Sequence, residues 1–558
     1  MTKYSRDPVK APRVKGLALK AFVKALESPV GGVVVDKIMA DSGFVRFREL
    51  DAGTASPQDF PLPQPSPAPK AGKPHEMAAA VVDAVAASTP STGPETVSRF
   101  VAAYREGVSP VDVAARIEKS VQRFAAEGMG FFIARKPEEL ARDAAASAQR
   151  HKEKKTLSVL DGIPFVIKDE LDVEGYATTL GTSWRNAVAT TDSTIAARLK
   201  AAGALLVGKG NMNEIGINPI GLNPHWGVCR NPWDKTRICG GSSSASAATV
   251  AAGLAPISIG ADGGGSIRIP ASLCGVVGLK ATHGRIPETG VPPLCWTPGH
   301  AGPFGRTVAD VAAAYAVIAG SDGHDQASLA QPAPSLEDFA KLDVKGLRVG
   351  VTWPWLEDAD KDVVARTKEA IKALTDRGCV VVEVPPVDLN RILWAHATII
   401  LSEMATAMRG EIAKGIERFA YDTRTNLAIA QRFSAMDYVH ALRHRHAITQ
   451  ETLEIFKTVD VIATPTTATT APPIPEDTLP DGDSNLPVVD GLMRFVRIGN
   501  LVGYPAISVP CGFDSAGLPV GFHLMGRAWE EHTLLRLARV VELASEQRQP
   551  KGVASALS

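Results

Sequence analysis

The spacing of apolar residues along the chain changes near residue 160. Before this point apolar residues recur every three or four positions, first over 17–26 and later through an alanine-rich stretch that ends near residue 150. This spacing is typical of amphipathic helices. After this point short apolar runs alternate with alanine-rich helical patterns. The alternation predicts an α/β fold with a largely parallel sheet.

The second part of the chain repeats this alternation. In chain order the sequence predicts a strand at 160–169, a helix at 193–203, a strand at 204–210, a helix at 245–253 and a strand at 254–260. A later series has a strand at 347–353, a helix at 362–374 and a strand at 379–384. Because such units continue to about residue 545 without a second linker, we expect one large domain over 76–545, with 76–150 as its helical lead-in.

Residues 1–75 are predicted to form an N-terminal helical extension. Ser28-Pro29 interrupts its apolar pattern, so we expect two helices, followed by an extended proline-rich connection over 56–74. The two helices either dock on the core of their own protein or contact lipid. At the other end, residues 546–558 are expected to form a flexible tail.

Composition and charge narrow the classes of function. Hydrophobic residues make up 45% of the 558 residues, and 60 basic residues balance 60 acidic ones, so nothing favours nucleic acid or an acidic substrate as a partner. The six cysteines stand singly and are expected to be reduced, mostly buried thiols. The start has no apolar core of a signal peptide, and no apolar run has the length of a membrane span. We therefore expect an intracellular protein, cytoplasmic or attached to a membrane surface.

One motif in the chain imitates a phosphate-binding loop. GALLVGKG at 203–210 has the spacing of G-x-x-x-x-G-K-[ST], but Gly210 occupies the hydroxyl position, and the apolar interior predicts a strand. The patterns G-x-G-x-x-G, H-E-x-x-H, G-x-S-x-G and S-x-x-K are missing. Their absence argues against dinucleotide enzymes, zinc peptidases, α/β-hydrolases and penicillin-binding acylases.

Two glycine-rich turns carry the candidate chemistry. They form the two ends of residues 240–268 and contain five of the six serines of this stretch: Ser242, Ser243, Ser244, Ser246 and Ser266. A flexible linker would not contain the helix and strand predicted between the turns, so both turns are anchored in the core. Gly263, Gly264 and Gly265 allow a sharp turn whose backbone N–H groups can bind an oxyanion beside Ser266.

A serine hydroxyl needs a base before it attacks a carbonyl. His225 and His283 are the nearest histidines in the sequence, and their spacing excludes neither. The other candidate is Lys168, which ends an apolar run. Burial disfavours the charged form of an amine, so a buried lysine can accept a proton near neutral pH. The serine-rich turn 240–244 can supply a hydroxyl that bridges Lys168 to Ser266.

Three of these stretches resemble the amidase signature family. They are GIPFVIKD at 162–169, GGSSS at 240–244 and GADGGGSIRIPA at 260–271. The resemblance implies an α/β fold with a mixed, twisted β-sheet covered by helices. It also implies an acyl-enzyme mechanism with a Ser–cis-Ser–Lys triad, which requires no cofactor and no metal.

The family resemblance assigns a role to each position of the motif. Lys168 becomes the base, Ser242 the bridging serine that follows a cis peptide bond, and Ser266 the nucleophile. The backbone amides of Gly263, Gly264, Gly265 and Ser266 become the oxyanion hole. Ser243 would support the triad, and Asp262 and Arg268 would form a structural pair that fixes the turn. Ala245 and Ala261 replace the family's usual glycine and threonine, and neither replacement removes a catalytic group.

Longer stretches resemble the plant-type fatty acid amide hydrolases over nearly the whole chain, at 9–37, 158–172, 421–439, 460–475 and 492–510. This resemblance implies fatty acid amides such as N-acylethanolamines as substrates, peripheral membrane contact through the N-terminal helices, and a homodimer. Segments 399–408 and 492–496 are candidate walls for an acyl chain. The alternatives are a broad aryl or short-chain amidase on the same scaffold, one subunit of a glutamine amidotransferase, and a catalytically silent binding protein.

Overall fold

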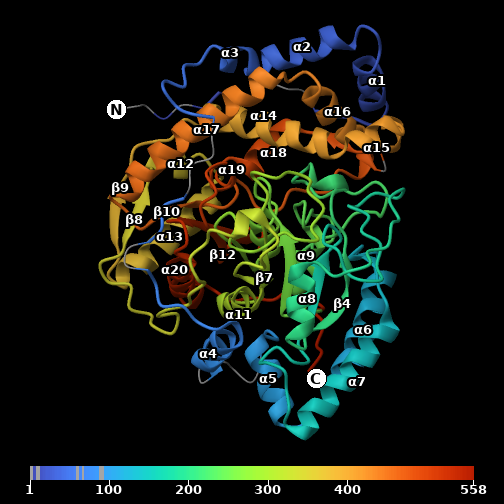
Figure 1. Ribbon diagram of the computed structural model, residues 1–558, viewed down its shortest axis with the longest axis vertical. Coiled ribbons are helices and arrows are strands. Elements are labelled where there is room, and N and C mark those ends of the chain that lie inside the picture. Colours follow the sequence, from blue (N-terminus) through green and yellow to red (C-terminus); the bar gives the residue numbers. More distant parts are fainter. Residues whose placement is uncertain are drawn as a thin grey trace.

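The computed structural model describes residues 4, 6–7, 13–57, 62–65, 68–86, 93–479 and 481–557 (Figure 1). Within these residues, eleven strands form one sheet in the order β2-β4-β3-β5-β7-β6-β12-β13-β10-β8-β9. Their bounds are β2 Phe132–Ala134, β3 Pro164–Lys168, β4 Leu205–Gly210, β5 Ile257–Ala261, β6 Val277–Lys280, β7 Ala301–Gly305, β8 Arg348–Val351, β9 Val380–Glu383, β10 Val461–Pro465, β12 Ala506–Phe513 and β13 Pro519–Gly526. A separate short pair joins β1 Val14–Lys15 to β11 Asp483–Ser484.

The sheet is mixed and covered by helices, as the family resemblance implied, whereas the largely parallel sheet expected from the local alternation was wrong. Parallel pairing is confined to two groups, β4-β3-β5 near one edge and β10-β8-β9 at the other. Between them, β5, β7, β6, β12, β13 and β10 pair antiparallel. The physical reason is local connectivity, because β12 and β13 follow one another through a tight turn and pair as a hairpin.

Helices cover the sheet, and the hydrophobic core lies between the sheet and these helices. Their bounds in the N-terminal part are α1 Gly16–Leu26, α2 Gly31–Asp41, α3 Phe44–Arg48, α4 Pro74–Ala86, α5 Val97–Arg105, α6 Pro110–Ala126 and α7 Pro137–Glu153. In the middle they are α8 Thr194–Ala201, α9 Ser244–Ala251, α10 Arg268–Cys274, α11 Val308–Ile318, α12 Trp353–Leu356 and α13 Lys361–Asp376. The remaining helices are α14 Leu389–Ala407, α15 Arg409–Ala413, α16 Tyr421–Ala430, α17 Ala435–Phe456, α18 Leu486–Met493, α19 Arg497–Leu501 and α20 Glu531–Ala544. All eleven residues of α11 are buried, as expected for a helix that is apolar on every side.

The N-terminal helices dock on the body of the protein. Figure 1 shows α1, α2 and α3 at one end of the molecule, over α14, α16 and α17. Apolar side chains of α1 and α2 pack against Phe433, and Phe47 of α3 packs between Trp394 and the ring of His444. Glu27 pairs with Arg424 at the same contact. The sequence left open whether these helices dock on their own protein or contact lipid. The structure shows that one face of them docks on the protein.

The end of the chain differs from the expected flexible tail. Ala554 and Ala556 are buried, and the Ala554 N–H donates to the Ala252 carbonyl at 2.7 Å. Glu95 accepts hydrogen bonds from the backbone of Ala556 and Leu557. Burial of two alanines and these backbone contacts hold the described part of 546–558 against the domain. None of the described helices has the length and hydropathy that a membrane span requires.

The imitation of a phosphate loop is a strand, as predicted. Residues 205–210 form β4 between β2 and β3. The Lys209 side chain is fully buried, 3.3 Å from Asp169, and its Nζ donates to the Ala177 carbonyl at 3.0 Å. The lysine of this motif is thus committed to an internal ion pair.

Candidate active site

Lys168 and Ser242 meet in the interior. β3 ends at Lys168, and the serine-rich turn precedes α9. Lys168 Nζ donates to Ser242 Oγ at 2.9 Å, and both side chains are almost fully buried. The peptide bond between Gly241 and Ser242 is cis. The structure therefore brings together two of the three residues predicted to form the triad.

Ser243 ties the serine-rich turn to the glycine-rich turn. Its Oγ donates to the Ala261 carbonyl at 3.0 Å and accepts from the Ala261 N–H at 3.2 Å. Ala261 is the last residue of β5, and the glycine-rich turn that ends at Ser266 follows it directly. Ser266 is half-buried. The contact links the two turns, and the support of the triad by Ser243 stays a prediction.

Asp262 and Arg268 hold the glycine-rich turn in shape. Both are fully buried and form an ion pair at 3.0 Å, and Asp262 Oδ2 also accepts from the Ile267 N–H. Asn500 of α19 donates to the Asp262 carboxylate and accepts from Arg268. Burial alone would raise the pKa of Asp262, but the charge of Arg268 lowers it far below its ordinary value. Arg268 also donates to the Val496 carbonyl at 2.8 Å and contacts His523 at 3.1 Å, so the pair ties the turn to distant segments of the chain.

The oxyanion site differs from the expectation at one residue. The Gly265 N–H donates to Asp262 Oδ1 at 2.5 Å, so this amide is committed to the turn. The amides of Gly263, Gly264 and Ser266 remain as candidate oxyanion donors. Gly265 has a φ of +122°, and a Cβ there would lie 2.5 Å from Val496, so both backbone and space require glycine.

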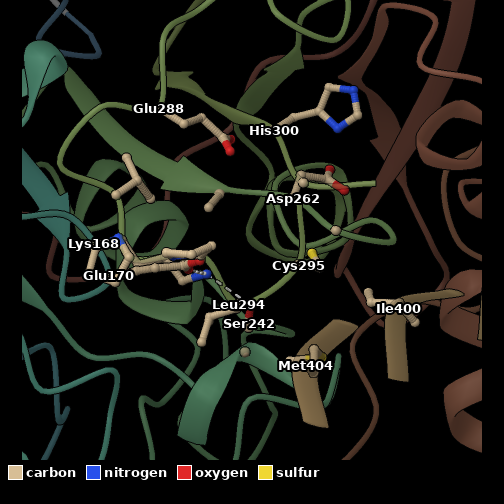
Figure 2. A pocket seen from close by; sticks show the side chains of 17 residues that line it. Lys168, Glu170, Ser242, Asp262, Glu288, Leu294, Cys295, His300, Ile400 and Met404 are labelled. Carbon is tan, nitrogen blue, oxygen red and sulfur yellow. Dashed lines mark hydrogen bonds and ion pairs between the residues drawn. The ribbon is translucent and has the colours of Figure 1, made fainter. Parts of the chain in front are cut away.

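A cavity opens beside the Lys168–Ser242 pair (Figure 2). Its lining comes from the ends of β3 and β5, the serine-rich turn, the segment 288–300 and α14, and comprises Lys168, Glu170, Gly216, Ser242, Ala261, Asp262, Gly263, Glu288, Val291, Pro292, Pro293, Leu294, Cys295, Gly299, His300, Ile400 and Met404. Figure 2 shows Lys168, Glu170 and Ser242 close together, with Ile400 and Met404 at another side.

The cavity is acidic on the side of Lys168. Glu170 Oε2 lies 2.5 Å from Lys168 Nζ, and both side chains are buried. Burial and the negative charge of Glu170 raise the pKa of Glu288 to about 8. Burial, followed by the charges of nearby carboxylates, raises the pKa of the Cys295 thiol well above its ordinary value. Glu288 and Cys295 are therefore neutral at pH 7.

The histidine candidates for the base lie in other contacts. His225 contacts Glu214 at 2.5 Å and Ser183 at 3.1 Å. The ring of His283 packs edge-on against His300. Lys168 is the candidate base that the structure places on a serine of the glycine-rich turns.

Sequence reasoning missed three residues that shape the site. Glu170 could have been noticed, since it stands two positions after Lys168. His396 of α14 contacts the Gly263 carbonyl at 2.8 Å, and Asn500 contacts Asp262. Both residues reach the turn from distant segments, so no local pattern announces them.

The candidate acyl-chain walls separate in the structure. Ile400 and Met404, from segment 399–408, line the cavity. In segment 492–496, Leu492 and Val496 belong to a buried apolar cluster, and Val496 lies against Gly265. The first segment therefore lies on the cavity and the second supports the turn.

Known proteins resemble this chain over most of its length. The family model named Amidase matches residues 116–535. A fatty acid amide hydrolase of Arabidopsis thaliana is 37% identical over 98% of this chain and 95% of its own length. One subunit of the glutamyl-tRNA(Gln) amidotransferase of a Synechococcus species is 36% identical over 69% of this chain and 84% of its own length.

A solved structure shares the fold. The peptide amidase of Stenotrophomonas maltophilia superposes with a TM-score of 0.70 at 26% identity, over 84% of this chain and 100% of that chain. The family model covers more than half of the chain and includes Lys168, Ser242 and Ser266. The chain therefore belongs to the Amidase family and is a hydrolase that acts on amides.

Proposed function

We propose that the protein hydrolyses fatty acid amides, such as N-acylethanolamines, to a free acid and an amine through an acyl-enzyme on Ser266. The observation that carries the chemistry is the buried hydrogen bond between Lys168 and Ser242. The similarity to the Arabidopsis fatty acid amide hydrolase, which includes the N-terminal extension, supports the choice of substrate. The amidotransferase relative matches a smaller share of this chain.

The proposed mechanism uses groups of this chain alone. As Ser266 attacks the carbonyl, its proton passes to Ser242, and the Ser242 proton passes to neutral Lys168. The Lys168–Ser242 contact then works in the reverse direction to that of the resting hydrogen bond. The oxyanion is stabilised by the backbone amides of the glycine-rich turn. The proton returns to the departing amine, and water releases the acid by the same relay.

The acyl chain is expected to decide the rate. Ile400 and Met404 supply apolar surface at the cavity, and each buried methylene contributes about 0.8 kcal/mol. We therefore expect kcat/KM to rise at least about ten-fold from butanoyl to palmitoyl ethanolamide. Turnover of saturated and unsaturated acylethanolamides, measured beside an acetanilide, tests this. A preference for the anilide or the short chains would instead favour the aryl or short-chain amidase.

We also propose that the N-terminal helices contact membrane surfaces. Leu17, Val30 and Val33 are 82%, 66% and 73% exposed, although one face of their helices is docked on the protein. Replacing all three with serine is expected to weaken binding to phosphatidylcholine vesicles at least about ten-fold, because it removes apolar surface from the contact. Leu543→Ser, at an exposed leucine of α20, is the matched control. Equal vesicle binding by the triple variant and the wild type would contradict the proposal.

A further inference from the structure

Glu170 is a second charged group in contact with the proposed base. It lies two residues beyond the end of β3, and its side chain turns back to Lys168 at 2.5 Å. The Glu170 side chain is 8% exposed and that of Lys168 1%. Glu170 Oε2 accepts no hydrogen bond of good geometry from the described residues, and Lys168 Nζ is the polar atom that lies beside it.

A carboxylate at this distance changes the chemistry expected from burial alone. Burial disfavours the ammonium form of a lysine, whereas a neighbouring negative charge favours it. The attraction between charges is strong in this contact because little solvent reaches either group. The two effects oppose each other at this contact.

We propose that Glu170 sets the proton affinity of Lys168 and stabilises the ammonium ion that forms when Ser266 attacks. This inference rests on the proposed function of Lys168. One proton moves from Ser266 to Ser242 and one from Ser242 to Lys168, so the amine gains a positive charge while Glu170 stays negative. The proton later leaves with the amine. Glu170 touches no reacting atom, and it is a positioning residue that acts through Lys168.

The other acidic groups near Glu170 do not provide a negative charge beside Lys168. Across the cavity these are Glu288 and Cys295, on which its charge acts. With a pKa of about 8, Glu288 carries no charge at pH 6 to 7. Asp169, the residue between Lys168 and Glu170, pairs with Lys209. Glu170 is therefore the anion that Lys168 meets within the described site.

The test is the pH dependence of kcat/KM for a soluble acyl amide. In Glu170→Gln the ammonium form of Lys168 loses its partner, so the amine stays neutral to lower pH. The acid limb of the profile is expected to move to lower pH. The plateau is expected to fall as well, because a weaker base transfers the proton more slowly. Glu170→Asp, which keeps the charge, should move the limb back toward the wild type.

Two further variants make the result decisive. Glu174→Gln removes an exposed carboxyl four residues further along the chain, so its acid limb should match that of the wild type. An acid limb of Glu170→Gln that stays in place or moves up, with activity falling equally at every pH, would overturn the proposal and leave a structural role. Lys168→Met separates the role of Lys168 from the role of Glu170. Activity in that variant would refute Lys168 as the base, and with it the proposed function. If the variant is inactive, a negative result with Glu170→Gln contradicts only the role of Glu170.

Discussion

Ser266→Ala is expected to lower kcat by roughly 10⁴-fold or more while the protein stays folded. The methyl group cannot form an acyl-enzyme, and the relay from Lys168 through Ser242 then has no hydroxyl to deprotonate. The turn itself depends on Asp262, Arg268 and Asn500, none of which the substitution touches. The thermal midpoint should therefore stay close to that of the wild type.

Turnover of an acylethanolamide and a thermal melt measure the two halves of this prediction. Ser272→Ala is the matched control, because Ser272 is a buried serine of α10, six residues further along, whose hydroxyl contacts Thr467. This variant should keep its turnover. Wild-type rates in Ser266→Ala would show that another residue attacks the amide.

Lys168→Met is expected to abolish turnover to a similar degree. Methionine fills much of the same space but cannot accept the proton of Ser242. Lys168→Arg should be equally inactive, because a guanidinium stays charged at every pH the protein tolerates. The substitution to methionine also leaves the buried Glu170 carboxyl without its polar partner, so a loss of stability accompanies the loss of rate.

A second buried lysine separates stability from catalysis. Lys209 lies on the neighbouring strand β4 and pairs with Asp169. Lys209→Met also strands a buried carboxylate, and it should lower the thermal midpoint while the folded fraction keeps its turnover. Equal loss of turnover per folded molecule in the two methionine variants would contradict the role of Lys168 as base.

The strands next to the candidate site could be predicted from the sequence, because buried strands are short apolar runs. The runs that became β3, β4 and β5 could be found without a structure. The order of the sheet could not, since strand pairing depends on contacts between distant segments. The local alternation of strands and helices predicted a parallel sheet, and it did not predict the antiparallel pairing in the centre of the sheet, from β5 to β10.

The sequence predicted those residues of the candidate site that stand in short, continuous motifs. Lys168, Ser242 and Ser266 lie in glycine-rich or strand-end patterns, while the cis bond before Ser242 followed from the family resemblance alone. Glu288 and Cys295 stand in the irregular segment 281–300, where side chains follow no period. The homodimer stays a prediction, which sedimentation equilibrium can test.

The most direct test of the account is to map the residue that a fluorophosphonate labels. Trypsin leaves Ser242 and Ser266 on one peptide, residues 238–268, so fragmentation of that peptide has to place the label. The account predicts a phosphonylated Ser266 in the wild type and a strongly slowed reaction in Lys168→Met. A label on Ser242 or on another residue, or labelling that proceeds equally fast without Lys168, would contradict it.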